Sequence, residues 1–386
     1  MMKTNLNCVH LWNSIRVNNS GTCTSCCLQN LHYKDDFNQD LNIRKHTLED
    51  IINSNTVNQI RKDLSEGKRN IHCKQCWDLE DAGVESKRMI DNKHLENSNT
   101  PEIKYLDLNM GTTCNIKCMT CGPENSAQWN KEMWEYSNKS FNGITDPKEY
   151  KEFVRTFNTA FEDDSLIWKE LKKQKNTLTR IDMYGGEPML MLKQWKFLEQ
   201  LIEDDLAKNI SLHYNTNGTI WDEEKYNTLK EFKNVSIDFS IDGLEEQFEY
   251  MRFPANWNEV RNNMEEISKF NFDLSICHTV SSLNVWYIKE FLDHFNKWNY
   301  YLNLVHGPPE YNIQNLSNKI KAYVTEKYKD DERAKQIISF MNNKSSIYNG
   351  HDGFLKAFRN KVGFSDKFRG NDYTLTFPEF ASMIEY

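Results

Sequence analysis

From residue 101 onward, short apolar runs alternate with longer stretches of helical periodicity. The β-prone runs predict six strands, at Ile103–Leu108, Thr179–Tyr184, Ile210–Tyr214, Val235–Ile241, Phe272–Thr279 and Tyr301–Val305. The stretches between them predict helices, at Met191–Asp205, Asp222–Phe232, Asn256–Phe270 and Val285–Trp298. Repeated βα units are typical of a parallel sheet, and a closed barrel needs eight of them. We therefore expect an α/β fold, either a partial (β/α)6 TIM-like barrel or an open sheet.

The pattern differs on either side of this region. The first 95 residues show few regular elements, and we expect a strand at Leu11–Val17 and a helix at Thr47–Leu64. A polar linker is expected at Asp91–Thr100. An oversized and mainly helical crossover is expected at 122–176. Beyond residue 311, the charged helical stretches Asn318–Tyr328 and Arg333–Met341 precede what we expect to be an irregular tail. The predicted domains are a small domain at 1–95, the barrel at 101–310 and a helical C-terminal extension at 311–386.

Charge and hydropathy narrow the class of protein. The chain has 386 residues, with 48 Lys and Arg against 56 Asp and Glu, which gives a net charge of −8. This acidic balance disfavours general nucleic-acid binding. We find no run of about 18 apolar residues and no apolar stretch at the N-terminus, so we expect no membrane association and a cytoplasmic location. In that compartment, the 10 cysteines indicate metal ligation or redox chemistry rather than disulfides.

The cysteines are concentrated in the first third of the chain, where all but Cys277 lie before residue 122. Cys114, Cys118 and Cys121 form a CxxxCxxC run that follows the first predicted barrel strand. Three thiolates at this spacing can bind three irons of a 4Fe–4S cluster and leave the fourth iron open to another ligand. The alternatives are a loop of buried thiols or a zinc site without its fourth ligand.

This run resembles the signature of the radical S-adenosylmethionine (SAM) superfamily, and later strand ends are similar to the same family over about 103–306. Gly185, Gly186, Glu187 and Pro188 resemble its GGEP turn, which holds the methionyl amino group. The third and fourth strand ends, with Asn215, Ser240, Asp242 and Arg252, resemble positions that approach the SAM ribose and carboxylate. A later strand, with His278 and Asn284, is similar to the strand near the adenine. Taken singly, each run also fits an ordinary βα turn.

The N-terminal cysteines resemble a twitch domain, a shortened SPASM domain that holds an auxiliary iron–sulfur cluster, although here the candidate precedes the barrel. The resemblance nominates Cys8, Cys26, Cys73 and Cys76 as ligands, with Cys23 and Cys27 as alternates. A four-cysteine zinc site, built from the Cys23-x2-Cys26 and Cys73-x2-Cys76 pairs, is the competing interpretation. The expected cofactors are a SAM-binding 4Fe–4S cluster, an auxiliary 4Fe–4S cluster and SAM.

The resemblance implies an oxidoreductase-type enzyme that takes an electron from an external reductant and reductively cleaves SAM to a 5′-deoxyadenosyl radical. That radical abstracts hydrogen from the substrate. We expect the substrate to be a peptide or protein, because an open barrel admits a bulky chain. The alternatives are a sugar or nucleotide substrate and, in another class, a non-enzymatic metal-cluster scaffold. No spacing singles out a general acid or base.

Overall fold

The structure is a computed structural model of the chain, and it describes residues 6–29, 31–81, 85–96, 99–161, 166–343 and 351–385. The chain divides into two compact units. Unit 1 comprises 1–113, 155–214 and 223–236, and unit 2 comprises 114–154, 215–222 and 237–386.

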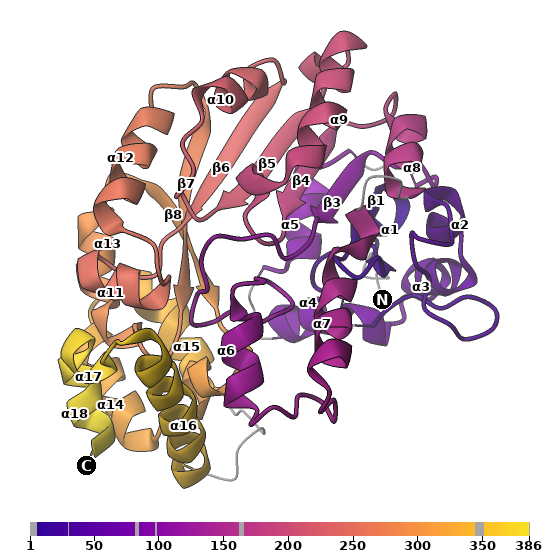
Figure 1. Cartoon of the computed structure of the whole chain (residues 1–386). Helices are drawn as coiled ribbons and strands as arrows, with labels where there is room; N and C mark the ends of the chain where they lie inside the picture. The colour runs from indigo at the N-terminus through magenta and orange to yellow at the C-terminus, as the bar shows by residue number, and fades with distance from the viewer. Residues whose placement is uncertain are drawn as a thin grey trace. The chain divides into compact units, whose positions relative to one another are not determined.

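The strands confirm an α/β fold with a mostly parallel sheet. Eight strands follow the order β2-β1-β3-β4-β5-β6-β7-β8, and no described pairing joins β8 back to β2. Strands β1 and β3 to β8 are labelled in Figure 1. Strand β1 (Ser14–Val17) pairs with β2 (Cys23–Thr24) in antiparallel fashion and with β3 in parallel fashion. The six predicted strands are observed as β3 (Tyr105–Asn109), β4 (Arg180–Tyr184), β5 (Ser211–Thr216), β6 (Asn234–Ser240), β7 (Asp273–Val280) and β8 (Asn299–Leu304).

Unit 1 contains eight of the described α-helices. They are α1 (His10–Asn13), α2 (Leu48–Ile52), α3 (Asn55–Ser65), α4 (Lys74–Asp81), α5 (Lys87–His94), α8 (Leu166–Gln174), α9 (Leu192–Glu203) and α10 (Glu223–Leu229). The single helix expected at Thr47–Leu64 is two helices, because the Ser54 side chain accepts a hydrogen bond from the backbone N–H of Val57 and starts a new one.

Two other expectations for the N-terminal region were wrong in part. The first half of the stretch expected to be a strand is helix α1, and strand β1 begins only at Ser14. The expected linker begins inside α5, which continues to His94 because the Ser86 side chain caps its first turn and Arg88 is buried. The predicted domain boundaries at 95, 101 and 310 remain predictions.

In unit 2, helices include α6 (Trp129–Tyr136), α11 (Glu245–Met251), α12 (Trp257–Ile267), α13 (Ile288–His294), α14 (Asn318–Tyr328) and α15 (Lys335–Asn342). Helix α7 (Pro147–Arg155) ends at the border between the units. The irregular tail expected after residue 341 is wrong. Helices α16 (His351–Arg369), α17 (Tyr373–Thr376) and α18 (Pro378–Glu385) occupy it, and Phe354, Phe358, Phe377 and Phe380 of this stretch are buried.

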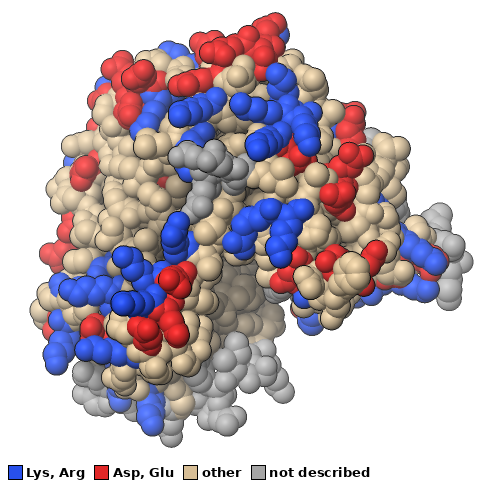
Figure 2. Space-filling view, turned by 45° about the vertical axis from the view of Figure 1, so that its right-hand side comes forward, with Lys and Arg blue, Asp and Glu red and all other residues tan. Residues whose placement is uncertain are grey.

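Both signs of charge occupy the surface. Figure 2 shows lysine and arginine side chains together with acidic ones over the face in view. Among the described helices, none combines the length and the apolar character needed to cross a membrane.

Candidate functional site

The CxxxCxxC loop follows strand β3 and lies in unit 2. Cys118 is buried, whereas Cys114 and Cys121 are half-buried. The loop backbone is fixed by hydrogen bonds from Lys117 N to Phe253 O at 2.7 Å and from Met119 N to Met251 O at 2.8 Å. The thiols are therefore presented by a loop whose main chain is held against the end of α11.

Arg252 connects this loop to the fourth strand end. Its Nη1 donates to Cys118 Sγ at 3.6 Å, and its Nη2 pairs with Asp242 Oδ2 at 2.8 Å. Burial opposes the charge on Arg252, but Asp242 and the thiols hold its pKa above the ordinary value. A hydrogen bond from Cys121 lowers the pKa of Cys118, and the Arg252 guanidinium lowers it further. Cys118 is thus prepared to be a thiolate, which is the form that binds metal.

Asn217 is a contact of the loop that the sequence interpretation missed. Its Nδ2 donates to Asn115 Oδ1 at 3.0 Å and lies 3.9 Å from Cys114 Sγ. The nominated Asn215 instead donates from Nδ2 to the Tyr301 hydroxyl at 3.1 Å. Ser240 is half-buried as the last residue of β6. In the run Asn215-Thr-Asn-Gly218, only the turn geometry distinguishes the two asparagines, and the sequence carries no signal for it.

The predicted GGEP turn lies in unit 1 and packs against the residue that precedes the cysteine loop. Gly186 has φ +50°, and a Cβ there would lie 2.2 Å from the carbonyl oxygen of Thr113. The backbone N–H of Glu187 donates to the same oxygen at 2.8 Å. The buried Glu187 carboxylate accepts a hydrogen bond from Met189 N at 3.1 Å, and Pro188 begins a short 3-10 turn. The glycines are needed because the two backbones touch.

The auxiliary-site cysteines gather around one cavity in unit 1. Cys8, Cys26, Cys73 and Cys76 all line it, together with Leu11, Leu28 and polar groups that include His10, Gln29 and His72. The alternates do not line it: Cys23 is buried and donates from its thiol to Gly21 O at 3.5 Å, and Cys27 is exposed. The cavity therefore brings together the set of four that the resemblance nominates.

The chemistry of this cavity suits a metal cluster. Burial, with some repulsion from neighbouring sulfurs, raises the pKa of Cys8 to about 12 and that of Cys73 to about 11. Protons on such thiols are released when a metal binds and supplies positive charge. Among the described residues, no three His, Cys, Asp or Glu side chains converge on one point that a single metal ion would occupy. In a 4Fe–4S cluster each thiolate binds a different iron, so four thiols around a cavity fit that group.

Comparisons with known proteins agree with this geometry. Residues 108–295 match the Radical SAM superfamily, and residues 8–77 match SPASM, an iron–sulfur cluster-binding domain. No curated protein matches the chain.

Solved structures show a likeness of low identity. One is histidine-tagged anSMEcpe with bound AdoMet, at 19% identity and TM-score 0.39, covering 60% of this chain and 58% of that chain. Another is Streptococcus suis SuiB bound to S-adenosylmethionine, at 14% identity and TM-score 0.36, covering 78% of this chain and 54% of that chain. This chain thus spans less than two thirds of either structure.

The two family matches confirm the recognition made from the cysteine spacings and the cofactors it implied, 4Fe–4S clusters and SAM. The chain carries a radical SAM domain over residues 108–295, preceded by a SPASM iron–sulfur cluster-binding domain over residues 8–77.

Proposed function

We propose that this protein is a radical SAM enzyme that modifies a peptide or protein. The observation that carries the proposal is the surroundings of the cysteine loop, where Arg252 reaches Cys118 and Asn217 lies beside Cys114. In this proposal Cys114, Cys118 and Cys121 hold the SAM-binding cluster, and Cys8, Cys26, Cys73 and Cys76 hold the auxiliary one. A scaffold without chemistry has no need of a charged arginine directed at a ligand thiol.

The residues of the chain have separate tasks. When bound, the cluster supplies the electron for reductive cleavage of SAM. Arg252 offsets the negative charge of the thiolates, and Asp242 holds the guanidinium in place at 2.8 Å. Gly185, Gly186, Glu187 and Pro188, with Asn215 and Ser240, are proposed to hold SAM. Glu187 carries a carboxylate suited to the methionyl amino group.

The edge of the sheet in unit 2 supports a peptide rather than a small molecule as the substrate. Strand β8 pairs with β7 along one side only, and no described strand pairs with its other side. Its residues are exposed or half-exposed throughout, and Tyr301 is 43% exposed. A strand edge of this kind accepts an extended peptide through main-chain hydrogen bonds, with side chains read at alternate positions. A sugar or nucleotide has no use for such an edge.

The first experiment measures release of 5′-deoxyadenosine by the anaerobically reconstituted protein with SAM and dithionite. Cys114→Ala is the inactive control and Cys277→Ala, a buried cysteine outside both sites, is the matched control that retains the activity. Release by the wild type and by Cys277→Ala, but not by Cys114→Ala, is expected. Equal release by Cys114→Ala overturns the proposal.

The second experiment separates the substrate classes. Pools of linear peptides, of sugars and of nucleotides are added separately, and the rate of 5′-deoxyadenosine release is compared with the rate without addition. We expect acceleration by the peptide pool. Acceleration by sugars or nucleotides and by no peptide overturns the peptide assignment but leaves radical SAM chemistry in place.

A further inference from the structure

The cavity of the auxiliary-site cysteines in unit 1 is lined by the amide side chain of Gln29 as well as by the four nominated thiols. Gln29 is buried, with 8% of its surface exposed. Its Nε2 donates a hydrogen bond to Cys73 Sγ at 3.9 Å. Gln29 thus provides an uncharged side-chain N–H group that is directed at one of the proposed cluster ligands.

The orientation of the Gln29 amide is fixed by two donors at its other end. The backbone N–H of Ser25 donates to Gln29 Oε1 at 2.9 Å, and the Tyr33 hydroxyl donates to the same oxygen at 2.7 Å. A backbone N–H group can only donate, so the atom that it faces is the amide oxygen and not the amide nitrogen. The Nε2 group is therefore the end of the side chain that faces Cys73.

The residues that hold this amide are themselves buried. Ser25 is 3% exposed and Tyr33 is 1% exposed, and the Tyr33 hydroxyl also lies 2.5 Å from Ser25 Oγ. Rotation of the Gln29 amide by half a turn would place its Nε2 group against the Ser25 N–H, donor against donor. A buried donor without an acceptor is costly, because it has lost its hydrogen bonds to water. The amide is therefore held in the orientation that directs its N–H toward the sulfur.

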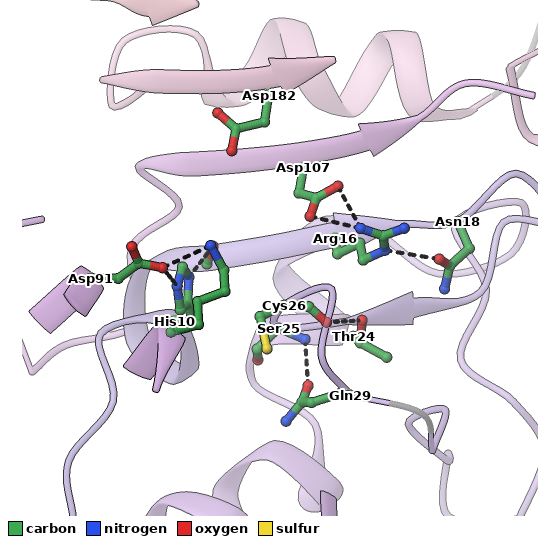
Figure 3. Close-up of polar contacts among 12 residues, drawn as sticks. His10, Arg16, Asn18, Thr24, Ser25, Cys26, Gln29, Asp91, Asp107 and Asp182 are labelled. Carbon is green, nitrogen blue, oxygen red and sulfur yellow. Dashed lines mark hydrogen bonds and ion pairs between the residues drawn. The ribbon is translucent and has the colours of Figure 1, made fainter. Parts of the chain in front are cut away.

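Gln29 belongs to the turn that carries Cys26. The Cys26 carbonyl accepts hydrogen bonds from the Gln29 backbone N–H at 3.3 Å and from Thr24 Oγ1 at 3.0 Å. Figure 3 shows the bond between Gln29 and Ser25, with Cys26 and Thr24 next to them. The turn therefore supplies one proposed ligand, Cys26, and a donor to another, Cys73, which lies 44 positions after Gln29.

Main-chain N–H groups serve the other three proposed ligands. These hydrogen bonds to Cys8, Cys26 and Cys76 come from the backbone of His10, Leu28 and Arg88, respectively. At Cys73 the donor is the side chain of Gln29. A side-chain donor can be removed by a single substitution that leaves the backbone donors unchanged, so its effect on the site can be measured.

We infer that Gln29 is a positioning residue that donates a hydrogen bond to the Cys73 sulfur and thereby raises the reduction potential of the auxiliary cluster, an inference that rests on the ligand set proposed above. Hydrogen bonds to the sulfurs are one of the means by which a protein sets the potential of an iron–sulfur cluster. The reduced form carries one more negative charge than the oxidised form, so a donor at a ligand sulfur stabilises the reduced form. The contacts with Ser25 and Tyr33 keep that donor in place.

The two cationic side chains of the cavity are paired with carboxylates. Arg88 Nη2 contacts Glu80 Oε2 at 2.8 Å, and Lys87 Nζ contacts Asp91 Oδ2 at 2.8 Å. These carboxylates offset part of the positive charge near the cysteines. A test of the hydrogen bond must leave this balance of charge unchanged, so the substitution is the neutral Gln29→Met, which has a similar length and no donor.

The first test measures the reduction potential of the auxiliary cluster by an anaerobic redox titration followed by electron paramagnetic resonance (EPR). The full chain is used with three substitutions that remove the other cluster, Cys114→Ala, Cys118→Ala and Cys121→Ala. In this parent, Gln29→Met is expected to lower the equilibrium constant for reduction about tenfold, which for a one-electron couple is a fall of about 59 mV. Gln59→Met is the matched control, because it replaces an exposed glutamine that donates to Asp63 at 2.7 Å on α3.

The outcomes of this titration are distinct. A change below about twofold in Gln29→Met overturns the inference, as does an equal change in Gln59→Met. Tyr33→Phe removes one bond to Gln29 Oε1 but keeps the bond from Ser25 N, so its potential is expected to fall by less than that of Gln29→Met. A larger fall in Tyr33→Phe overturns the inference, because the effect would then come from packing of the turn and not from the donor.

The second test needs no substitution at Gln29. The same parent is labelled with nitrogen-15 at the glutamine side-chain amides, and its reduced cluster is studied by pulsed EPR. We expect a coupling between the cluster and an amide nitrogen, and we expect it to persist in Gln75→Met, which replaces the glutamine between Cys73 and Cys76. A reduced cluster without this coupling overturns the inference, as does loss of the coupling in Gln75→Met.

Both tests can fail separately from the proposed function, because neither uses SAM or a peptide. A wild-type protein that releases no 5′-deoxyadenosine overturns the proposed function and leaves the potential of the auxiliary cluster to decide the role of Gln29. A cavity that binds zinc and no iron overturns the proposed ligand set and this inference together.

Discussion

A buried cluster of charged residues in unit 2 contacts the cysteine loop through Lys117. Glu132 of α6 is fully buried and accepts from Arg369 Nε at 3.1 and 3.0 Å, from Lys117 Nζ at 2.8 Å and from Ser365 Oγ at 2.7 Å. Lys117 lies within the loop, between Cys114 and Cys118. We predict that Glu132→Gln destabilises the protein and weakens iron binding by the loop.

The magnitude follows from the burial of the partners. Arg369 is 1% exposed and Lys117 is 13% exposed, so the substitution leaves two cations in the interior without an anion. Breaking a buried ion pair from one side costs about 3–5 kcal/mol. The carboxylate is ionised at neutral pH, because Arg369, Lys117 and Ser365 outweigh burial and lower its pKa. The full loss of unfolding free energy in Glu132→Gln is therefore expected at pH 7.

The assay is anaerobic urea unfolding of the metal-free protein at pH 7, followed by tryptophan fluorescence. Glu135→Gln on the same helix is the control, because its 4.0 Å contact with Lys139 is exposed and its loss costs about 0.5 kcal/mol or less. Replacing Glu132, Lys117 and Arg369 together by Leu, Met and Met should recover most of the loss. A change below about 1 kcal/mol in Glu132→Gln refutes the reasoning.

Three further predictions concern the other features of the chain. Cys73→Ala is expected to lower the iron content of the reconstituted protein by about half, whereas Cys23→Ala, whose thiol lies outside the cavity, leaves it unchanged. Gly186→Ala is expected to lower the free energy of unfolding by about 2 kcal/mol or more, because the new Cβ would clash with a backbone carbonyl at a residue of positive φ. Gly67→Ala is the control and should cost less, because a Cβ there has no other atom within 4 Å. Burial lowers the pKa of Lys361 from 10.5 to about 8, so the unfolded state binds the extra proton and stability rises between pH 8 and 10.5. Lys361→Met removes this rise, worth about 3 kcal/mol, in urea unfolding compared at pH 7 and 10.

Much of the sheet was predictable because polar and apolar residues alternate along its strands. Strand β5 has half-buried and buried residues in strict alternation, and this period is visible as polar and apolar residues in the sequence. Helix α14 begins and ends within the predicted stretch for the same reason, with Ile320 and Val324 on its buried side. The sequence therefore predicted the strands and helices in which buried positions are apolar and exposed positions are polar.

The C-terminal helices were missed because their buried face is not apolar throughout. Helix α16 buries Phe354 and Phe358, but along the same helix it also buries Lys361 and Ser365. Buried polar positions break the helical period of hydrophobicity, so the stretch resembles an irregular tail. Ser365 is explained only by its partner Glu132, which lies 233 positions before it, and Lys361 by the rings of Trp129 and Tyr136, over which its ammonium group lies. Spacing within a sequence carries no information on such a pair.

The residues of the candidate sites also differ in whether the sequence alone could identify them. The cysteines were found because closely spaced thiols have few uses in a chain of this kind, whereas Asn217 is a common residue whose contact with the cysteine loop depends on the folded structure. One sequence signal nevertheless points to a row of polar side chains that crosses strands β3, β4 and β5. Parallel strands covered on both faces read as continuous apolar runs. Strands β3, β4 and β5 instead carry Asp107, Asp182 and His213 at alternate positions, and in the folded protein these residues are register partners. Polar residues in these parallel strands therefore indicate that one face of the sheet is polar, and the shared register places their side chains next to one another.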